Sequence, residues 1–348
     1  MKMIEVDKIG SAASPIDPEH EMKIADSIAE PKAGDVVVVR ALSESVTYGN
    51  LELPSGRLAK INKGDILMGV LGRRRALKGF VGDVPNSLTA GDRLNLLNMG
   101  GVIGICSGHH SSLSDAIEVE VLGAVCDELG FVSNIGDSGL ESTSTLSPSA
   151  PIIMIAGSCM NSGKTVAATE LIEQAHRAGL KVAGAKLSGI ACLRDTLNMA
   201  DHGAFVTASF LDCGLPSTSA YGDLAPVAKA IFNHLNTFQP DLIVAELGDG
   251  IIGGYSVDTV LKDEEIKAAT ASFVFCASDY VGVVGGITTL SRLGIDIDVV
   301  AGSVTDSQMG EDFIESEFGL KAGNARRNGE RLFSLAKPVA LLQKAVIA

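Results

Sequence analysis

The chain reads Gly157-Ser-Cys-Met-Asn-Ser-Gly163-Lys164-Thr165 just before its midpoint, and this stretch decides the fold of everything after it. The residues directly before it, PIIMIA at 151–156, have the composition of a buried strand. Residues 164–177 have helical spacing, which Gly179 ends. A glycine-rich loop between a strand and a helix turns its N–H groups toward one point, and the helix N-terminus there favours an anion. The sequence therefore predicts a phosphate-binding loop.

Each position of this loop has an expected role. The residues expected to contact a nucleotide are Gly157, Asn161, Ser162, Gly163, Lys164 and Thr165. Among them, Lys164 would neutralise the β- and γ-phosphates, and the Thr165 hydroxyl would bind Mg²⁺. Five residues separate the two outer glycines, one more than in the common pattern. A glycine turn with a chance Lys-Thr pair is the alternative, and the flanking strand and helix argue against it.

Short apolar runs alternate with helical segments after the loop. The runs that read as strands are 181–186, 241–246, 272–276 and 297–302. Short apolar strands separated by helices are typical of a parallel sheet with both faces covered. We therefore expect an α/β fold for residues 151–348, a P-loop NTPase domain with a mostly parallel sheet, preceded by a smaller β-rich, barrel-like N-terminal domain.

A carboxylate ends one of these predicted strands. Glu246 closes the apolar run LIVAE, at the edge of a parallel sheet where ligands bind in such folds. Mg²⁺ takes few carboxylates and fills its other positions with water and phosphate oxygens, so Glu246 is a candidate metal ligand. The alternative is a solvated glutamate that merely ends a strand. Asp249 ranks second for the same role.

The extended loop is similar to that of the dethiobiotin synthetase and cobyric acid synthase group of P-loop proteins, where five residues also intervene. The likeness covers roughly residues 151–335 and includes LIVAE with the glycines that follow it. It implies that Lys186 is a second lysine near the γ-phosphate and the substrate, and that Asp195 contacts the metal. The domain of unknown function numbered 1611 (DUF1611) has a comparable loop.

These readings give a small set of site residues. The candidate catalytic residues are Lys164, Lys186 and Glu246, and the candidate metal ligands are Thr165, Glu246 and Asp195. The alternative for Lys186 is the first solvated residue after a strand, and the alternative for Asp195 is a helix N-cap. His202 lies nearby in the sequence and is more typical of a surface histidine.

The loop after the last predicted strand is expected to recognise the nucleotide base. Thr305 and Asp306 are candidates there by position alone. The Asn-Lys-x-Asp motif that reads guanine in GTPases is absent. This absence favours ATP as the nucleotide.

The first half of the chain has a different pattern. We expect a lead-in segment at 1–30, the β-rich domain at 31–132 and a linker at 133–150, which is rich in Ser, Thr, Gly and Pro. In the β-rich part, a Gly-Asp pair precedes an apolar run three times, at Gly34, Gly64 and Gly91. Each pair is a turn signal that leads into a short strand, as in a meander or small barrel.

Two further motifs in the first half have ordinary explanations. Cys106, His109 and His110 lack a second pair of ligands at zinc-like spacing, so we expect a polar loop rather than a metal site. The run Arg73-Arg74-Arg75 is expected to be solvated, with contact to an anionic substrate or a partner domain as the alternative.

The composition narrows the class of protein. Lys and Arg number 28 against 42 Asp and Glu, and the formal net charge of −14 argues against binding to nucleic acid. The six cysteines contain no CxxC pair, and the N-terminal residues are charged where a signal peptide is apolar. We therefore expect a cytoplasmic protein that does not engage membranes.

The expected activity is an ATP- and Mg²⁺-dependent reaction on a small metabolite. The resemblance implies that the γ-phosphate activates a carboxylate or carbamate, as in a ligase or cyclase, and that two copies of the chain form a homodimer. One alternative is a nucleotide-dependent switch that acts through a protein partner. Another is a small-molecule kinase.

Overall fold

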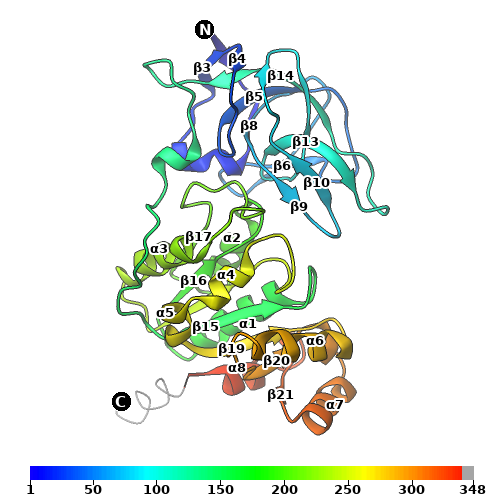
Figure 1. Ribbon diagram of the computed structural model, residues 1–348, viewed down its shortest axis with the longest axis vertical. Coiled ribbons are helices and arrows are strands. Elements are labelled where there is room, and N and C mark those ends of the chain that lie inside the picture. The colour runs from blue at the N-terminus through cyan, green and yellow to red at the C-terminus, as the bar shows by residue number, and fades with distance from the viewer. Residues whose placement is uncertain (339–348) are drawn as a thin grey trace. The chain divides into compact units, whose positions relative to one another are not determined.

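The computed structural model describes residues 1–338, which form two compact units. The β unit contains residues 1–140, 190–194 and 210–220, and the α/β unit contains the rest of the described chain. The expected boundaries differ from this division, because the β unit includes residues 1–30 and two short segments from the second half of the chain. Figure 1 shows the strands of the β unit in blue and cyan and the helices of the α/β unit in green to red.

The β unit is built from short strands and two 3₁₀ turns. Its strands are β1 (Lys2–Glu5), β2 (Lys8–Ile9), β3 (Glu21–Ala25), β4 (Ser27–Ile28), β5 (Val36–Ala41), β6 (Asn50–Glu52), β7 (Leu58–Lys60), β8 (Ile66–Leu71), β9 (Arg74–Arg75), β10 (Phe80–Asp83), β11 (Leu88–Thr89), β12 (Arg93–Leu96), β13 (Val102–His109) and β14 (Glu118–Val125). The 3₁₀ turns are Ser11–Ile16 and Ile135–Ser138.

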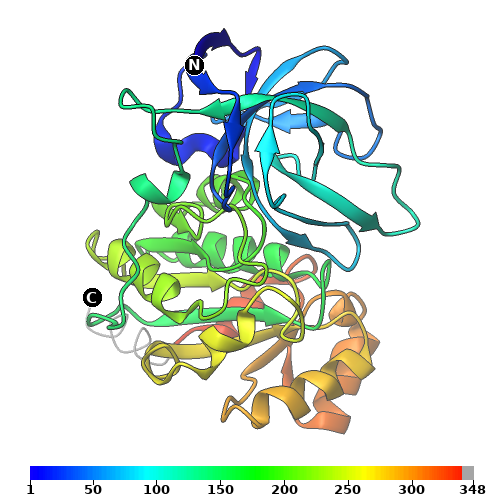
Figure 2. The ribbon, with the colours of Figure 1, turned by 45° about the horizontal axis from the view of Figure 1, so that its top comes forward.

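Five of these strands close into a barrel. The pairing runs from β14 through β5, β8, β13 and β12 and returns to β14, with β8 and β13 parallel and the other neighbours antiparallel. Alternate residues point inward, and the interior is filled by fully buried aliphatic side chains such as Val39, Leu67 and Val119. The strands curve around this interior in both views (Figures 1 and 2).

The three Gly-Asp pairs make the same turn. Each glycine has a φ between +94° and +97°, and each aspartate carboxylate accepts the N–H of the residue three positions earlier at 2.7 Å. Since only glycine adopts this backbone conformation without strain, the turn depends on it. The strands that follow are β5, β8 and β12, three of the five strands of the barrel.

Residues 1–30 are not the lead-in segment that the sequence predicts. Strands β1 and β3 pair with each other, and β3 also pairs with β14, with Ile24 fully buried. Residues 1–30 look charged in the sequence because β1 lies at the edge of the sheet and most of its side chains are exposed. Charged edge strands are common because they discourage pairing with other chains.

The α/β unit contains one parallel sheet and eight helices. Its strands are β15 (Ile152–Gly157), β16 (Val182–Lys186), β17 (Val206–Ser209), β18 (Leu242–Glu246), β19 (Thr270–Cys276), β20 (Val299–Ala301) and β21 (Lys321–Ala322). The helices are α1 (Lys164–Arg177), α2 (Arg194–Asp201), α3 (Ala225–Asn236), α4 (Val257–Lys262), α5 (Glu264–Ala269), α6 (Tyr280–Ser291), α7 (Gln308–Phe318) and α8 (Gly329–Ala336), with a 3₁₀ turn at Ser303–Thr305. The sheet order is β17-β16-β18-β15-β19-β20-β21, with β15 in the centre.

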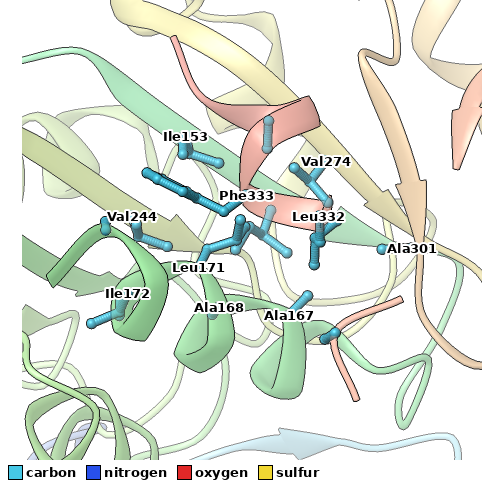
Figure 3. Packing of buried hydrophobic residues seen from close by; sticks show 14 of the residues in the cluster. Ile153, Ala167, Ala168, Leu171, Ile172, Val244, Val274, Ala301, Leu332 and Phe333 are labelled. Carbon is cyan, nitrogen blue, oxygen red and sulfur yellow. The ribbon is translucent and has the colours of Figure 1, made fainter. Parts of the chain in front are cut away.

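Helices cover both faces of this sheet. On one face, α1 and α8 pack over β15, β18 and β19, where Leu171, Leu332 and Phe333 meet Ile153 and Val274 (Figure 3). On the other face, residues of α4 and α5 line a pocket together with Met154 and Phe273, which alternate with Ile153 and Val274 along their strands. Within the described part of the chain, no helix combines the length and apolarity needed to cross a membrane.

A glycine substitution can test how much the Gly-Asp turns contribute to the stability of the barrel. Gly64→Ala places a methyl group where nothing lies within 4 Å, so its cost is the strain of a φ of +97°, about 1–2 kcal/mol. Gly285→Ala in α6 also meets open space but has an ordinary helical backbone, and is expected to be neutral or slightly stabilising. Thermal unfolding of both variants measures this difference; equal midpoints would contradict the role of the turn.

Candidate functional site

The loop between β15 and α1 has the backbone of an anion-binding loop. Gly163 has a φ of +101° and Asn161 a φ of +62°, which turns the chain tightly before α1 begins. A Cβ on Gly157 would lie 2.8 Å from the Cys276 carbonyl oxygen and 2.4 Å from the Ser162 hydroxyl oxygen, so a side chain there would clash with the backbone of β19. The N–H groups from Ser162 to Thr165 have no acceptor within residues 1–338, and no acidic residue lies in the first turn of α1. These N–H groups are therefore available to an anion.

Lys164 is buried within its own loop. The residue is 6% exposed. Its ammonium group donates hydrogen bonds to the Cys159 carbonyl at 2.8 Å and to the Ser162 hydroxyl at 3.5 Å. Burial lowers the pKa of Lys164, and the nearby Glu246 carboxylate partly offsets this effect. A cation held against neutral carbonyl and hydroxyl groups in a buried place gains strongly from an arriving phosphate.

Glu246 connects the loop to the neighbouring strand. Its Oε1 accepts a hydrogen bond from the Thr165 hydroxyl at 2.9 Å. The residue is 1% exposed, and Oε2 is buried with no hydrogen-bond partner among the described residues. A buried carboxylate oxygen without a partner is costly, so its presence points to a ligand that completes it.

Strand register brings a second lysine to the same carboxylate. Lys186 and Glu246 are paired positions at the ends of the adjacent parallel strands β16 and β18, so their side chains leave the sheet on the same face. The Lys186 ammonium lies 2.7 Å from Glu246 Oε1 and 2.7 Å from Asp195 Oδ2. Burial alone would lower the pKa of Lys186, but the carboxylates of Asp195 and Glu246 outweigh it and raise the pKa above its ordinary value.

Asp249 lies near the loop but plays a different part from Glu246. Burial raises the pKa of its carboxyl group, and the Lys164 ammonium acts in the opposite direction. The residue has a left-handed backbone, with a φ of +61°, three residues after the end of β18. Asp249 therefore faces the loop lysine electrostatically, whereas Glu246 is the carboxylate that contacts Thr165 and Lys186.

A pocket adjoins the other side of the loop. Its lining residues are Asn161, Gly163, Val166, Gly302, Ser303, Asp306, Asn324, Ala325 and Arg326. Of the two base-binding candidates, Asp306 lines this pocket but Thr305 does not. The Thr305 side chain is fully buried, and its hydroxyl is engaged by the Gly302 carbonyl at 2.8 Å and by the Asn324 amide at 3.1 Å. Thr305 therefore holds the loop together and does not face a ligand.

Asn324 and Arg326 also line this pocket and are not among the residues predicted from the sequence. They follow β21, a two-residue strand that has no recognisable apolar run. The signal that could have found them is the polar sequence Asn324-Ala-Arg-Arg-Asn directly after a short segment at the end of the sheet. Such a segment is too short for periodicity to indicate a strand.

Several other candidates make contacts of their own with neighbouring residues. His202 bonds to the Asn198 carbonyl in the turn that follows α2. In the β unit, His109 contacts Asp115 and His110 contacts Ser112. The prediction that Arg73-Arg74-Arg75 is a solvated run is wrong for its middle residue. Arg74 is 3% exposed and donates to the Leu97 carbonyl and the Tyr48 hydroxyl, because the guanidinium packs inside the unit.

The site fits Mg²⁺ only in combination with phosphate oxygens. Within residues 1–338, no group of three or more His, Cys, Asp and Glu side chains could hold a metal by itself. Thr165 and Glu246 provide a hydroxyl and a buried, partly unpartnered carboxylate directly beside the loop. Mg²⁺ commonly binds through one or two such oxygens plus phosphates and water, so these residues suit it. Asp195 is engaged with Lys186, beside this pair.

The α/β unit has the arrangement of a P-loop NTPase domain: a loop follows the central strand of a parallel sheet and leads into a helix.

No family model matches the chain, and no curated protein matches it either. Solved structures similar to it include chloroplast FtsY from Physcomitrella patens (12% identity, 57% of this chain and 70% of that chain, TM-score 0.37). A DUF1611 family protein from Anabaena variabilis has 10% identity over 56% of this chain and 62% of that chain, with a TM-score of 0.39. The signal recognition particle 54 kDa protein from Aeropyrum pernix K1, in complex with GDP, has 15% identity over 60% and 52%, with a TM-score of 0.37.

A double-mutant cycle can test the ion pair between Lys186 and Glu246. Lys186→Met is expected to destabilise the protein by about 3–5 kcal/mol, because it leaves the buried Glu246 carboxylate without its ion pair. Adding Glu246→Gln to that variant removes the uncompensated charge and is expected to restore a large part of the loss. Chemical unfolding of the single and double variants measures the coupling. Additive losses would show that the two side chains do not interact.

Proposed function

We propose that this chain binds a nucleoside triphosphate with Mg²⁺ at the loop 157–165 and transfers the γ-phosphoryl group to an acceptor. The observation that carries the proposal is the buried Glu246 carboxylate. One of its oxygens is shared by Thr165 and Lys186, and the other has no partner among the described residues, beside a loop with free N–H groups. Phosphoryl transfer at such a loop uses N–H donors, a lysine, and a hydroxyl and a carboxylate that bind the metal, and all of these are present here beside a second lysine.

Each group has a part in stabilising the transferred phosphoryl group. The N–H groups from Ser162 to Thr165 and the Lys164 ammonium bind the β- and γ-phosphates and hold them in line for transfer. Lys164 exchanges its bond to the Cys159 carbonyl for a bond to phosphate. Lys186 adds positive charge where negative charge develops. Thr165 and Glu246 would hold Mg²⁺, which would supply positive charge against the charge of the phosphates.

The acceptor that we propose is a carboxylate or carbamate of a small metabolite. An acceptor oxygen forms a bond to the γ-phosphorus as the bridging P–O bond to the nucleoside diphosphate breaks, and the diphosphate leaves with that electron pair. The resulting acyl phosphate then reacts with an amine or closes a ring, with release of phosphate. Lys186 supports this acceptor class because a cation at the end of β16 attracts an anionic substrate to the phosphates. The resemblance to the dethiobiotin synthetase and cobyric acid synthase group supports it as well.

A nucleotide-dependent switch is the second candidate, and one feature favours it. Residues 190–194 belong to the β unit, where the buried Glu52 accepts the Leu193 N–H at 2.6 Å. The next residue along the chain is Asp195, which pairs with Lys186. If nucleotide hydrolysis moves the Lys186 side chain, Asp195 moves with it. Because Asp195 directly follows residues 190–194 in the chain, that movement reaches a segment of the β unit.

Stimulation of hydrolysis separates these functions. A carboxylate-activating enzyme or a small-molecule kinase hydrolyses or transfers faster only with its own metabolite, and the product shows whether a carboxylate or a hydroxyl was phosphorylated. A switch responds to a protein partner and is unaffected by any metabolite. Glu52→Gln weakens the hydrogen bond from the Leu193 N–H. In a switch, this variant is expected to alter the rate of nucleotide hydrolysis. In a carboxylate-activating enzyme or a kinase, it is expected to leave the unstimulated rate unchanged.

Lys164 provides the direct test of the loop. Lys164→Ala is expected to weaken binding of a nucleoside triphosphate about 10- to 100-fold, the loss of a charge-assisted bond to phosphate. Lys181→Ala, an exposed lysine of the same unit, is the matched control and should bind normally. Titration with a fluorescent nucleotide analogue measures both variants. Unchanged binding by Lys164→Ala would rule out the loop as the phosphate site.

Glu246 provides the test of the metal. Glu246→Gln keeps the size of the side chain and its bond to Thr165, but removes the charge that attracts Mg²⁺. The Mg²⁺ concentration needed for half-maximal hydrolysis is therefore expected to rise several-fold. Asp258→Asn, a partly exposed residue of α4, serves as the control. A metal titration that matches the unmutated protein would remove Glu246 from the site.

A further inference from the structure

The pocket beside the loop points to the base of the nucleotide. We propose that it selects guanine over adenine, and that the Asp306 carboxylate is the group that selects it. The proposal rests on the nucleotide binding proposed above, and it revises the expectation of ATP.

The pocket is positioned by the same loop that binds the phosphates. Gly163 and Gly302 pack so closely that a Cβ on Gly163 would lie 2.9 Å from the Gly302 Cα, and the Ser303 N–H donates to the Ser162 carbonyl at 3.2 Å. Asn161 and Gly163 of the phosphate-binding loop also line the pocket. A nucleotide with its phosphates on the loop therefore has this pocket next to it, formed by the segments that follow β20 and β21.

Asp306 is held in the pocket by Asn324, whose own hydrogen-bonding groups are all engaged. The Asn324 amide oxygen accepts the N–H groups of Arg326 and Arg327 at 3.0 and 2.8 Å. The Asn324 amide nitrogen donates to the Thr305 hydroxyl at 3.1 Å and to Asp306 Oδ1 at 2.9 Å. Asn324 is 2% exposed and has no hydrogen-bonding capacity left for a ligand. Its effect is to fix the orientation of the Asp306 carboxylate.

The Asp306 carboxylate still has capacity for a ligand. The residue is exposed, and its Oδ2 has no hydrogen-bond partner within residues 1–338. An ionised carboxylate is an acceptor only, and its two oxygens can receive two parallel N–H donors. Arg326 also lines the pocket with an exposed side chain, and a guanidinium plane is suited to stacking on a base.

The two bases differ in what they offer to such an acceptor. Guanine has an N1–H and a 2-amino group side by side, two donors at the spacing of one carboxylate. Adenine has an N6 amino donor beside N1, which carries a lone pair and would face the negative carboxylate. The carboxylate receives both donors of guanine, whereas adenine offers it one donor and one repelling lone pair. The carboxylate therefore matches guanine and repels adenine.

The absence of the Asn-Lys-x-Asp motif does not oppose this assignment. In this chain Ser303 and Val304 occupy the positions of Asn and Lys, while the aspartate is present at 306. The contacts that orient the loop come instead from Asn324, which is distant in the sequence. The sequence motif is missing, but the group that contacts the base in our proposal is retained.

Binding of GDP, ADP and xanthosine diphosphate (XDP) to the full chain with Mg²⁺ tests this proposal. For the unmutated protein we expect GDP to bind at least about tenfold more tightly than ADP. Asp306→Asn replaces two acceptors by one acceptor and one donor, which match the N1–H and the C2 carbonyl of xanthine. This variant is therefore expected to lose tight GDP binding and to gain XDP binding by a similar factor.

The gain of XDP binding distinguishes a change of specificity from misfolding. Asp312→Asn, an exposed residue of α7 outside the pocket, is the control and should keep the GDP preference. Equal binding of GDP and ADP, or tighter binding of ADP, would overturn the base assignment and leave the proposed nucleotide site intact. An Asp306→Asn variant that keeps its GDP preference would also overturn it. If no diphosphate binds, the proposed function fails together with this inference.

Discussion

The candidate site depends on one buried carboxylate. Glu246 Oε1 is shared by the Thr165 hydroxyl and the Lys186 ammonium, which come from a helix N-terminus and from the end of a neighbouring strand. A buried anion of this kind is tolerated only if cations and hydrogen-bond donors surround it. The positions of the loop, of β16 and of β18 are therefore mutually constrained. The second oxygen of Glu246 remains without a partner among the described residues, and this supports the proposal that a ligand binds beside it.

Parts of this site could be predicted from the sequence because they are local. The glycines and Lys-Thr pair of the loop, and Glu246 at the end of an apolar run, are recognised within a few residues. That Lys186 and Glu246 contact each other could not be predicted, since it requires β16 to pair with β18 in one particular register across 60 residues. The pairing of Lys186 with Asp195 depends on α2 and is equally non-local.

The errors in the first half and at the pocket beside the loop have the same origin. Residues 1–30 look unstructured because β1 is an exposed edge strand, whose sequence carries little sign of its pairing. Arg74 looks solvated because its sequence neighbours are arginines, while its partners Tyr48 and Leu97 lie more than twenty residues away. Thr305 and Asp306 are adjacent, yet only Asp306 lines the pocket, since the turn at Ser303–Thr305 buries the threonine. Composition and position do not contain this information.

The central claim is that the loop 157–165 binds a nucleotide together with Mg²⁺. Thermal unfolding of the unmutated chain, with a nucleoside triphosphate added in the presence and in the absence of Mg²⁺, tests it most directly. A ligand at 100 times its dissociation constant stabilises the folded state by about 2.7 kcal/mol, which is a readily measured shift. The account predicts a clear rise of the unfolding midpoint that is larger with Mg²⁺ than without it. An unchanged midpoint with both ATP and GTP at millimolar concentration would contradict it.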